Sequence, residues 1–284
     1  MLARFYTYAS FVRFGHSVFA LPFALTGALL ASRIVPLTWM RVVWIAACMV
    51  AARSAAMGFN RLVDASYDSR NPRTAMRELP QGAMSRREAV WFVVLTSAAF
   101  VFFAAQLGRT CLVLSPVALA IVFWYSLAKR YSAYTQAYLG LAMAVAPVGG
   151  WIAAGGPLGP EPWVLGLAIG TWVAGFDVLY ACQDLEVDRR EGLRSIPVRF
   201  GVARSLWISR GMHVVTVLAL ISVGVLSELG SVYRTGLVAV AGLLVYEQSL
   251  VSAADLSRVK QAFDLNGWVG LLYFAATWLD VYVS

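Results

Sequence analysis

Apolar stretches long enough to cross a membrane recur along this chain from one end to the other. A helix needs roughly 20 apolar residues to cross about 30 Å of hydrocarbon. Of the 284 residues, 60% are hydrophobic and 13% are charged. Because an ordinary soluble domain has about 25% charged residues, the sequence predicts an integral membrane protein. The expected spans are 14–31, 41–59, 89–107, 111–128, 137–154, 163–182, 206–226, 233–252 and 267–283.

The connections between these spans are mostly short, which is typical of a compact bundle, and two of them are long and charged. We therefore predict an all-α fold, namely a multi-pass transmembrane helical bundle of about nine helices. The bundle is expected to surround a central cavity that opens to the cytoplasmic side. Residues 1–284 are expected to form a single integral-membrane domain.

The basic residues are distributed unevenly between the two sides of the membrane. When the spans are counted from the N-terminus, the segments after the second, fourth, sixth and eighth spans carry most of the Arg and Lys residues. The positive-inside rule makes that side cytoplasmic, which predicts a protein of the cell's inner (plasma) membrane with its site facing the cytoplasm. This asymmetry explains the net charge of +8 without a nucleic-acid partner. The expected partner is the lipid bilayer.

Two acidic signatures follow apolar spans in a chain that has few charges. Asn60, Asp64 and Asp68 recur every four residues, and Asp184 and Asp188 repeat this spacing. Positions four apart share one face of an α-helix, so each signature presents two carboxylates side by side. Four crossings separate the two signatures, and this even number places both on the same side of the membrane.

The second signature extends into the membrane. Tyr180, Asp184 and Asp188 lie three, seven and eleven residues after Asp177, which predicts one narrow stripe along a helix. A carboxylate costs roughly 2.5 to 3.5 kcal/mol to insert at the centre of a membrane helix. Asp177 is therefore expected to face an interior cavity. Polar residues gather at the cytoplasmic ends of the spans, which favours a cavity opening to that side.

These side chains have the chemistry of a metal and phosphate site. Adjacent carboxylates repel each other and favour a cation between them, and oxygen ligands without a His or Cys cluster favour Mg²⁺ or Ca²⁺ over zinc. The candidate metal ligands are Asn60, Asp64, Asp68, Asp184 and Asp188. Cations that complement phosphate oxygens are Arg73, Arg77, Lys129, Arg130 and Arg194. One acidic pair alone is common at the end of a membrane helix, where it only faces solvent. Two such pairs on one side of the membrane favour a site for a metal and a diphosphate.

At these residues the sequence resembles the UbiA superfamily of membrane prenyltransferases. Asn60-x3-Asp64-x3-Asp68 matches the family's first aspartate-rich motif, and Tyr180-x3-Asp184-x3-Asp188 matches the second. The stretch YSLAKRY at 125–131 resembles the tyrosine and Lys-Arg segment that follows the fourth helix in the family.

Within the superfamily the sequence resembles the 4-hydroxybenzoate polyprenyltransferase branch, in particular the UbiA-like enzymes of the futalosine route to menaquinone. The segments that carry this similarity are HSVFALPFAL at 16–25, NPRT at 71–74, RELP at 77–80 and GLRSIP at 192–197. Many members place Asp directly after the first Asn of the motif, where this chain has Arg61. Arg61 is counted here as a candidate substrate-binding cation.

The resemblance implies Mg²⁺-dependent transfer of a polyprenyl group from polyprenyl diphosphate to an aromatic acid, 4-hydroxybenzoate or a dihydroxynaphthoate, in ubiquinone or menaquinone biosynthesis. The catalytic candidates are Asp64, Asp68, Asp184, Asp188 and Asp177, the last for acceptor binding or removal of the ring proton. Tyr125 and Tyr180 are candidate substrate-binding residues, and Arg13 and His16 are candidate partners of the acceptor carboxylate.

Two alternatives share some of these features. A secondary transporter for a phosphorylated or cationic solute also carries acidic residues inside the membrane, although it should have polar residues near the midplane of several spans. A UbiA-type enzyme with another acceptor, such as haem, a chlorophyll precursor or a lipid headgroup, would share both aspartate motifs. The sequence leaves open the acceptor, the prenyl chain length, the oligomeric state and the group that removes the ring proton.

Overall fold

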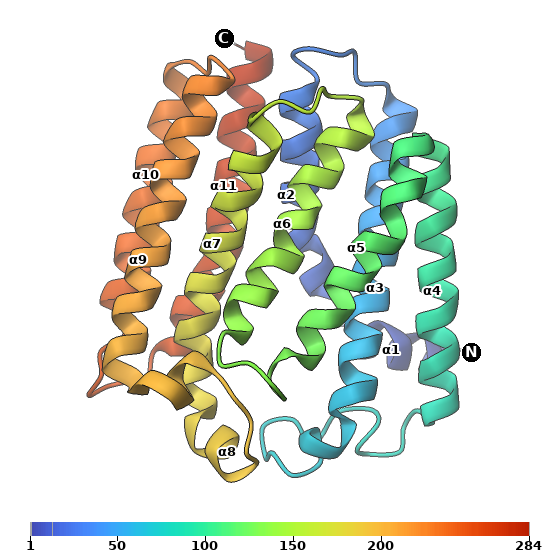
Figure 1. Ribbon diagram of the computed structural model, residues 1–284, viewed down its shortest axis with the longest axis vertical. Coiled ribbons are helices and arrows are strands. Elements are labelled where there is room, and N and C mark those ends of the chain that lie inside the picture. The colour runs from blue at the N-terminus through green and yellow to red at the C-terminus, as the bar shows by residue number, and fades with distance from the viewer. Residues whose placement is uncertain (1, 13, 284) are drawn as a thin grey trace.

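The computed structural model describes residues 2–12 and 14–283, with side chains for all of them except 2, 3, 5, 6, 9 and 14–20. The described part is helical, and its long helices run side by side along the long axis of the molecule (Figure 1). The long helices are α2 (Phe14–Ala31), α3 (Trp39–Asp68), α4 (Arg86–Leu107), α5 (Arg109–Ala128), α6 (Thr135–Ala154), α7 (Glu161–Ala181), α9 (Ile196–Leu226), α10 (Ser231–Ser249) and α11 (Val259–Val283). The short elements are α1 (Leu2–Phe11), the 3₁₀ turn η1 (Cys182–Asp184) and α8 (Leu185–Arg190).

Each predicted span coincides with one long helix, which confirms the all-α bundle. Six helices of the described part are long and apolar enough to cross a membrane, namely α3, α4, α5, α6, α7 with its continuation and α9. The segment Leu21–Ala31 of α2 is a shorter apolar helix. The helices α10 and α11 place Glu247, Asn266 and Asp280 inside the bundle, which lowers their hydropathy.

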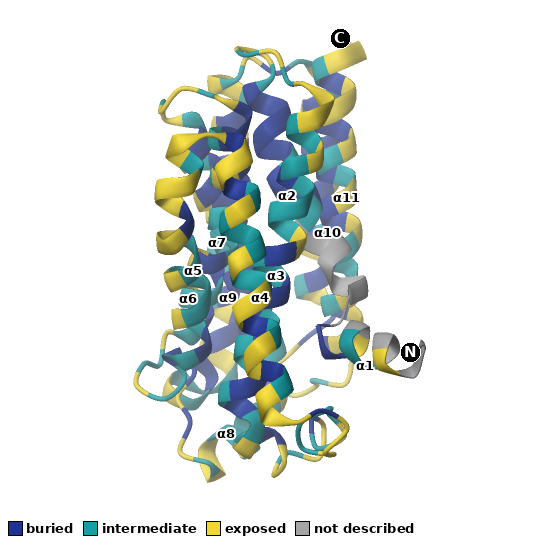
Figure 2. Ribbon diagram, turned by 90° about the vertical axis from the view of Figure 1, so that its right-hand side faces the viewer, coloured by how far each residue is buried: buried dark blue, intermediate teal, exposed yellow. Residues whose placement is uncertain are grey.

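Exposed and buried residues alternate around the helices as a membrane bundle requires. Buried residues face the bundle axis and exposed ones face outward (Figure 2). The outward face of α4, for example, exposes Trp91, Leu95 and Phe102. Large apolar side chains on a surface of this length fit contact with lipid, because hydrocarbon chains do not penalise their exposure. The chain is accordingly an integral membrane protein.

Hydrogen-bonding side chains fix where several helices begin. Ser85 and Glu88 form a capping box at the start of α4, with the Ser85 hydroxyl accepting from the Glu88 amide and the Glu88 carboxylate accepting from the Ser85 amide. Ser195 accepts from the Val198 amide at the start of α9. Such caps satisfy amides that lack a partner within the helix, so the starts of α4 and α9 are specified locally.

Close backbone contact holds α6 against α2 and α7. A β-carbon on Gly150 would lie 1.9 Å from the carbonyl oxygen of Ala24, and one on Gly27 would lie 2.0 Å from that of Pro147. A β-carbon on Gly140 would likewise lie 2.3 Å from the carbonyl oxygen of Gly170. Small residues permit such approach between membrane helices. The helices α2, α6 and α7 therefore form a tightly packed group in the bundle.

The segments 69–85, 129–134 and 182–195 all lie at the lower end of the bundle in Figure 1. Side-chain and backbone hydrogen bonds join them, including those from Arg73 to Asp184 and from the Arg194 amide to the Lys129 carbonyl. The prediction that both acidic signatures emerge on one side of the membrane is confirmed. The sequence did not predict α1, a short helix whose Phe11 is buried against the edge of Phe92.

Candidate active site

The first acidic motif forms a wall on the last turns of α3. Asn60, Asp64 and Asp68 share one face of this unbroken helix, as their spacing predicts. The Asn60 amide donates to Asp64 at 3.2 Å, and both aspartates are buried. Arg61 is also buried in α3, and its role in substrate binding stays a prediction.

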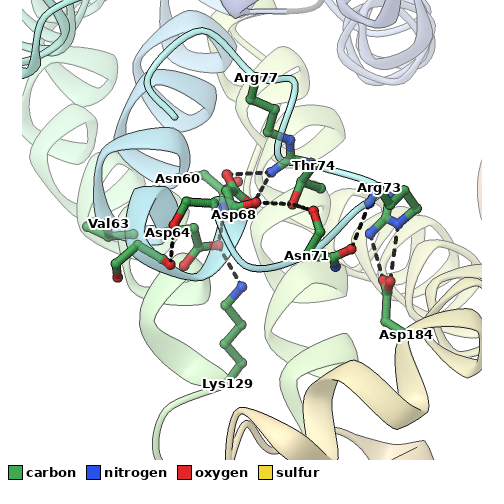
Figure 3. Close-up of polar contacts among 12 residues, drawn as sticks. Asn60, Val63, Asp64, Asp68, Asn71, Arg73, Thr74, Arg77, Lys129 and Asp184 are labelled. Carbon is green, nitrogen blue, oxygen red and sulfur yellow. Dashed lines mark hydrogen bonds and ion pairs between the residues drawn. The ribbon is translucent and has the colours of Figure 1, made fainter. Parts of the chain in front are cut away.

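Cations from other segments hold both carboxylates of this wall (Figure 3). Lys129 Nζ lies 2.7 Å from one oxygen of Asp64, and Arg130 Nη2 lies 2.9 Å from the other. Arg77 Nη1 lies 2.8 Å from each oxygen of Asp68. The structure thus brings together the first motif and three of the predicted phosphate-binding cations.

The ring of Tyr67 contacts three basic side chains beside the first acidic motif. Its ring lies 5.8 Å from Lys129 Nζ, 5.4 Å from the Arg130 guanidinium and 5.3 Å from that of Arg70. The electron-rich face of an aromatic ring attracts such cations. Tyr67 therefore helps to keep Lys129 and Arg130 at the position where they meet Asp64.

Arg73 connects the first motif to the second. The Asn71 side chain accepts from the Arg73 amide at 2.9 Å, a local turn that directs Arg73 away from α3. The Arg73 guanidinium donates to both oxygens of Asp184, at 3.1 and 2.7 Å, and to the Tyr180 hydroxyl at 3.0 Å. A two-pronged Arg–carboxylate pair fixes orientation as well as distance, so Arg73 sets the spacing between the motifs.

The second motif is not on one continuous α-helix, and that prediction is wrong. The helix α7 ends at Ala181, the turn η1 carries Asp184, and α8 carries Asp188. A 3₁₀ turn has about three residues per turn instead of 3.6, so it rotates Asp184 and Asp188 relative to the stripe of Asp177. The tight turn coincides with the point at which Arg73 binds Asp184.

Asp188 differs from the other motif aspartates. Within the described part of the chain, no basic side chain lies within 4 Å of it, whereas Asp64, Asp68 and Asp184 each form an ion pair. Burial, helped by the Asp184 carboxylate, raises the pKa of Asp188 to about 6, while Lys129, Ser195 and Arg73 act in the opposite direction. Its negative charge is therefore the least compensated in the cluster.

A second polar group lies deeper in the bundle, between α3, α5 and α7. Asp177 is partly exposed although its neighbours Phe176 and Val178 are buried. It interacts electrostatically with Tyr125 on α5, which places both side chains toward the same interior region. The two side chains therefore lie near each other, and that Asp177 faces an interior cavity stays a prediction.

Arg53 belongs to this deeper group, and the sequence analysis missed it. Its side chain interacts electrostatically with Tyr125, and its Nε is buried without a hydrogen-bond partner among the described residues. Arg53 lies seven residues before Asn60, which is two turns deeper on the same face of α3. That spacing could have identified it, because an Arg in an apolar span is costly unless it faces the interior.

The structure does not bring every predicted residue to the cluster. Arg194 donates through Nη1 to the Tyr131 carbonyl at 2.7 Å, on the outer side of the segment that carries Lys129. Arg13 lies outside the described residues, and so does the side chain of His16, whose backbone belongs to α2. Among the described residues, no three His, Cys, Asp or Glu side chains converge closely enough to hold a metal ion by themselves.

Fold and site together define a helical integral membrane protein with a cluster of acidic and basic groups at one end of its bundle. The model of the UbiA prenyltransferase family matches residues 20–274. A 4-hydroxybenzoate octaprenyltransferase of Nitrosospira multiformis is 32% identical over 234 residues, which are 82% of this chain and 80% of the relative. The chain belongs to the UbiA prenyltransferase family, and it is an enzyme, a prenyltransferase.

Solved structures agree with this assignment. The apo structure of a UbiA homologue from Aeropyrum pernix K1 is 37% identical, with a TM-score of 0.86 that covers 92% of this chain and 96% of the homologue. A UbiA homologue from Archaeoglobus fulgidus bound to DMAPP and Mg²⁺ has a TM-score of 0.69 at 19% identity, covering 95% of this chain and 99% of that one. The second comparison shows a shared fold.

Proposed function

We propose that this enzyme transfers a polyprenyl group from polyprenyl diphosphate to an aromatic acid, 4-hydroxybenzoate or a dihydroxynaphthoate, in ubiquinone or menaquinone biosynthesis. The similarity to futalosine-route enzymes favours the dihydroxynaphthoate and menaquinone. The reaction takes place at the charged end of the bundle, which faces the cytoplasm in the inner membrane by the positive-inside rule. The relative named 4-hydroxybenzoate octaprenyltransferase supports this class of acceptor.

The observation that carries the proposal is the charge balance of the cluster. The four motif aspartates lie among four cations, Arg73, Arg77, Lys129 and Arg130. These charges cancel, so a multiply charged diphosphate gains little from the cluster unless more positive charge arrives with it. A divalent metal supplies that charge, and the homologue bound to DMAPP and Mg²⁺ supports the same combination.

The donor atoms present fit Mg²⁺. They are carboxylate and amide oxygens, and Asp188 is a half-buried carboxylate that has no ion pair among the described residues. Mg²⁺ commonly takes one or two carboxylates from the protein and completes its shell with water and substrate phosphate, so it needs no cluster of three acids. Asn60, Asp64, Asp68, Asp184 and Asp188 would hold it, and when bound it would neutralise charge on the diphosphate as the carbon–oxygen bond breaks.

The protein's own cations bind and orient the leaving group. Arg73 and Arg77 present forked donors, and Lys129 presents a point charge, which suit phosphate oxygens. Groups already held in place stabilise the developing charge without reorganisation at the moment of reaction. The allylic group left behind lies deeper, where the apolar and aromatic spans exclude water from a central cavity.

The deeper polar group suits an acidic aromatic acceptor. Arg53 is half-buried, and its Nε has no hydrogen-bond partner among the described residues; a carboxylate is the group that pairs with a guanidinium in two-pronged geometry. Asp177 also interacts electrostatically with Tyr125, the partner of Arg53. We assign Arg53 to the acceptor carboxylate and Asp177 to binding the acceptor or removing the ring proton.

The test uses purified protein in detergent with a polyprenyl diphosphate and Mg²⁺. Each acceptor acid and its methyl ester should be compared, and the acid should be prenylated faster because only the acid pairs with Arg53. In Arg53→Gln the preference for the acid should fall by roughly tenfold, whereas Arg33→Gln on the opposite side should keep it. Failure of every phenolic acid to give product, alongside an active related enzyme, would contradict the proposed function.

A further inference from the structure

A basic pocket lies outside the acidic cluster at the same end of the bundle. It has a volume of about 380 Å³ and is lined by the connection between α5 and α6 and by the start of α9. Two arginines, Arg194 and Arg199, and two exposed tyrosines, Tyr131 and Tyr134, contribute to its walls. No acidic residue of the described chain lines it, so the pocket is positively charged.

The two arginines are available to a ligand. Arg194 uses Nη1 for the Tyr131 carbonyl, and the Arg199 guanidinium lies 5.4 Å from the Tyr134 ring and 5.2 Å from the Phe200 ring. Neither guanidinium lies within 4 Å of a carboxylate among the residues that the structure describes, in contrast to Arg73 and Arg77. Most of their N–H donors therefore remain open for an anion.

The segment 129–134 lies between this pocket and the first acidic motif. Lys129 points its amine at Asp64, while the carbonyl of the same residue accepts from the Arg194 amide at 2.8 Å. The Arg194 side chain then continues to the Tyr131 carbonyl on the outer side. An anion bound by Arg194 and Arg199 would thus lie apart from Asp64, whereas the pocket residue Ser195 also hydrogen-bonds to Asp188.

Aromatic side chains continue from the pocket along the outer surface. The rings of Tyr131 and Tyr138 are 6.3 Å apart, and those of Tyr138 and Trp124 are 5.7 Å apart. Trp124 is 53% exposed one turn before the end of α5. Tyr and Trp with one polar edge are typical of the membrane interface, so this column offers an apolar surface directly beside the two guanidinium groups.

The start of α9 is shaped to hold Arg199 at this level. Gly201 has φ 76° and breaks the helix after its first turn, so Arg199 precedes the spanning part of α9. A positive φ is readily adopted by glycine and is strained for other residues. The break keeps Arg199 beside Tyr134, at the end of the bundle, instead of on the membrane-crossing helix.

We propose that this pocket binds an anionic glycerophospholipid of the adjacent leaflet. Its phosphate pairs with Arg194 and Arg199, and its acyl chains lie along Tyr138 and Trp124. Basic residues near the membrane surface attract anionic lipids, and guanidinium groups form strong charge-assisted bonds with phosphate. The adjoining apolar column favours a lipid over free phosphate, because free phosphate gains nothing from it.

The experiment measures lipid retained by the full-length protein in detergent by native mass spectrometry. Phosphatidylglycerol is titrated against phosphatidylcholine, and the wild-type protein should bind phosphatidylglycerol roughly tenfold more tightly. Arg199→Gln should weaken that binding about fivefold, and adding Arg194→Gln should weaken it further. The matched control is Arg258→Gln with Lys260→Gln, which removes two charges at the start of α11 and should leave binding unchanged.

Three outcomes would overturn the proposal. Equal binding of phosphatidylcholine would show that the pocket does not select charge, and equal loss in the control variant would show a general surface attraction. Displacement of phosphatidylglycerol by inorganic phosphate at matched concentration would show an anion site without a lipid. The Arg199 side chain forms no hydrogen bond within the described structure and only contacts aromatic rings, so Arg199→Gln should fold, and its thermal unfolding checks this.

Discussion

The two acidic motifs lie at the same end of the bundle but are held in different ways. The first is part of the unbroken helix α3, where the Asp64 and Asp68 side chains are 4% and 8% exposed and each has a basic partner. The second crosses a 3₁₀ turn into α8, where the Asp184 side chain is 20% exposed and Asp188 has no ion pair among the described residues.

The first acidic motif therefore forms a fixed wall of the site, and the second forms a wall that can adapt. A buried carboxylate that loses its cation, or a cation that loses its carboxylate, is left with an uncompensated charge. The first motif therefore contributes to folding as well as to the site. A short helix after a 3₁₀ turn has fewer such ties, so the second motif can rearrange around a ligand with little effect on the stability of the bundle.

The largest expected effect is that of Asp64→Ala. Turnover should fall at least about 100-fold, because a group that stabilises the departing diphosphate is lost. The free energy of unfolding should also fall by about 2 kcal/mol, because Lys129 and Arg130 lose a charged partner. Product formation and thermal unfolding in the same detergent measure both effects. A near-normal rate at saturating Mg²⁺ would show that Asp64 has no role in catalysis.

Asp188→Asn should lose activity without losing stability. Turnover should again fall about 100-fold, because the metal loses a carboxylate ligand, and a higher Mg²⁺ concentration should partly restore it. The thermal unfolding midpoint should stay the same or rise, since a half-buried carboxylate that has no ion pair among the described residues is replaced by a neutral amide. A fall in stability as large as that of Asp64→Ala would show that the two walls are equally rigid.

Arg73→Lys tests the connection between the two walls. The charge is kept, but the forked contact with Asp184 and the bond to Tyr180 are lost, so kcat/KM should fall by roughly tenfold. Arg70→Lys is the control, because Arg70 lies in the same loop and pairs with Glu191 instead of a motif aspartate. Similar losses in both variants would assign the effect to the loop as a whole.

The smallest effect is expected at the opposite end of the bundle. Asp280 accepts hydrogen bonds from the amides of Gly230 and Tyr233 at 2.7 and 2.9 Å, and so caps the start of α10. Asp280→Ala should lower the free energy of unfolding by about 1 kcal/mol and leave kcat unchanged in assays below the unfolding temperature. A substantial loss of kcat would show that Asp280, which lies outside the two motifs, also contributes to catalysis.

The helices and the first motif were predictable because they depend on local patterns. Each membrane span is recognisable from its own apolar residues. The period of an α-helix alone is enough to place Asn60, Asp64 and Asp68 on one face of α3. The same reasoning failed after Ala181, because the 3₁₀ turn accompanies a contact between Asp184 and Arg73, which is distant in the sequence. Local periodicity contains no information about such a contact.

Arg53 and Arg194 differ in whether the sequence alone can predict their positions. Arg53 was detectable, since an Arg two turns below Asn60 on the same face of α3 follows from spacing alone. The position of Arg194 was not, because it depends on the path of the loop before α9, which the Arg194 amide fixes by bonding to Lys129. The sequence places Arg194 near the motif, and only the fold shows that its guanidinium turns outward.

The contact between α2 and α6 also determines when α2 can pack during synthesis of the chain. The ribosome completes α2 before α3, α4 and α5, yet Gly27 and Ala24 pack against Pro147 and Gly150 of α6. At roughly 5–20 residues per second, α2 spends on the order of ten seconds in the membrane before α6 exists. This early span thus gains its packing partner late in synthesis, and a chain that stops before α6 leaves the face of α2 that carries Gly27 without that partner.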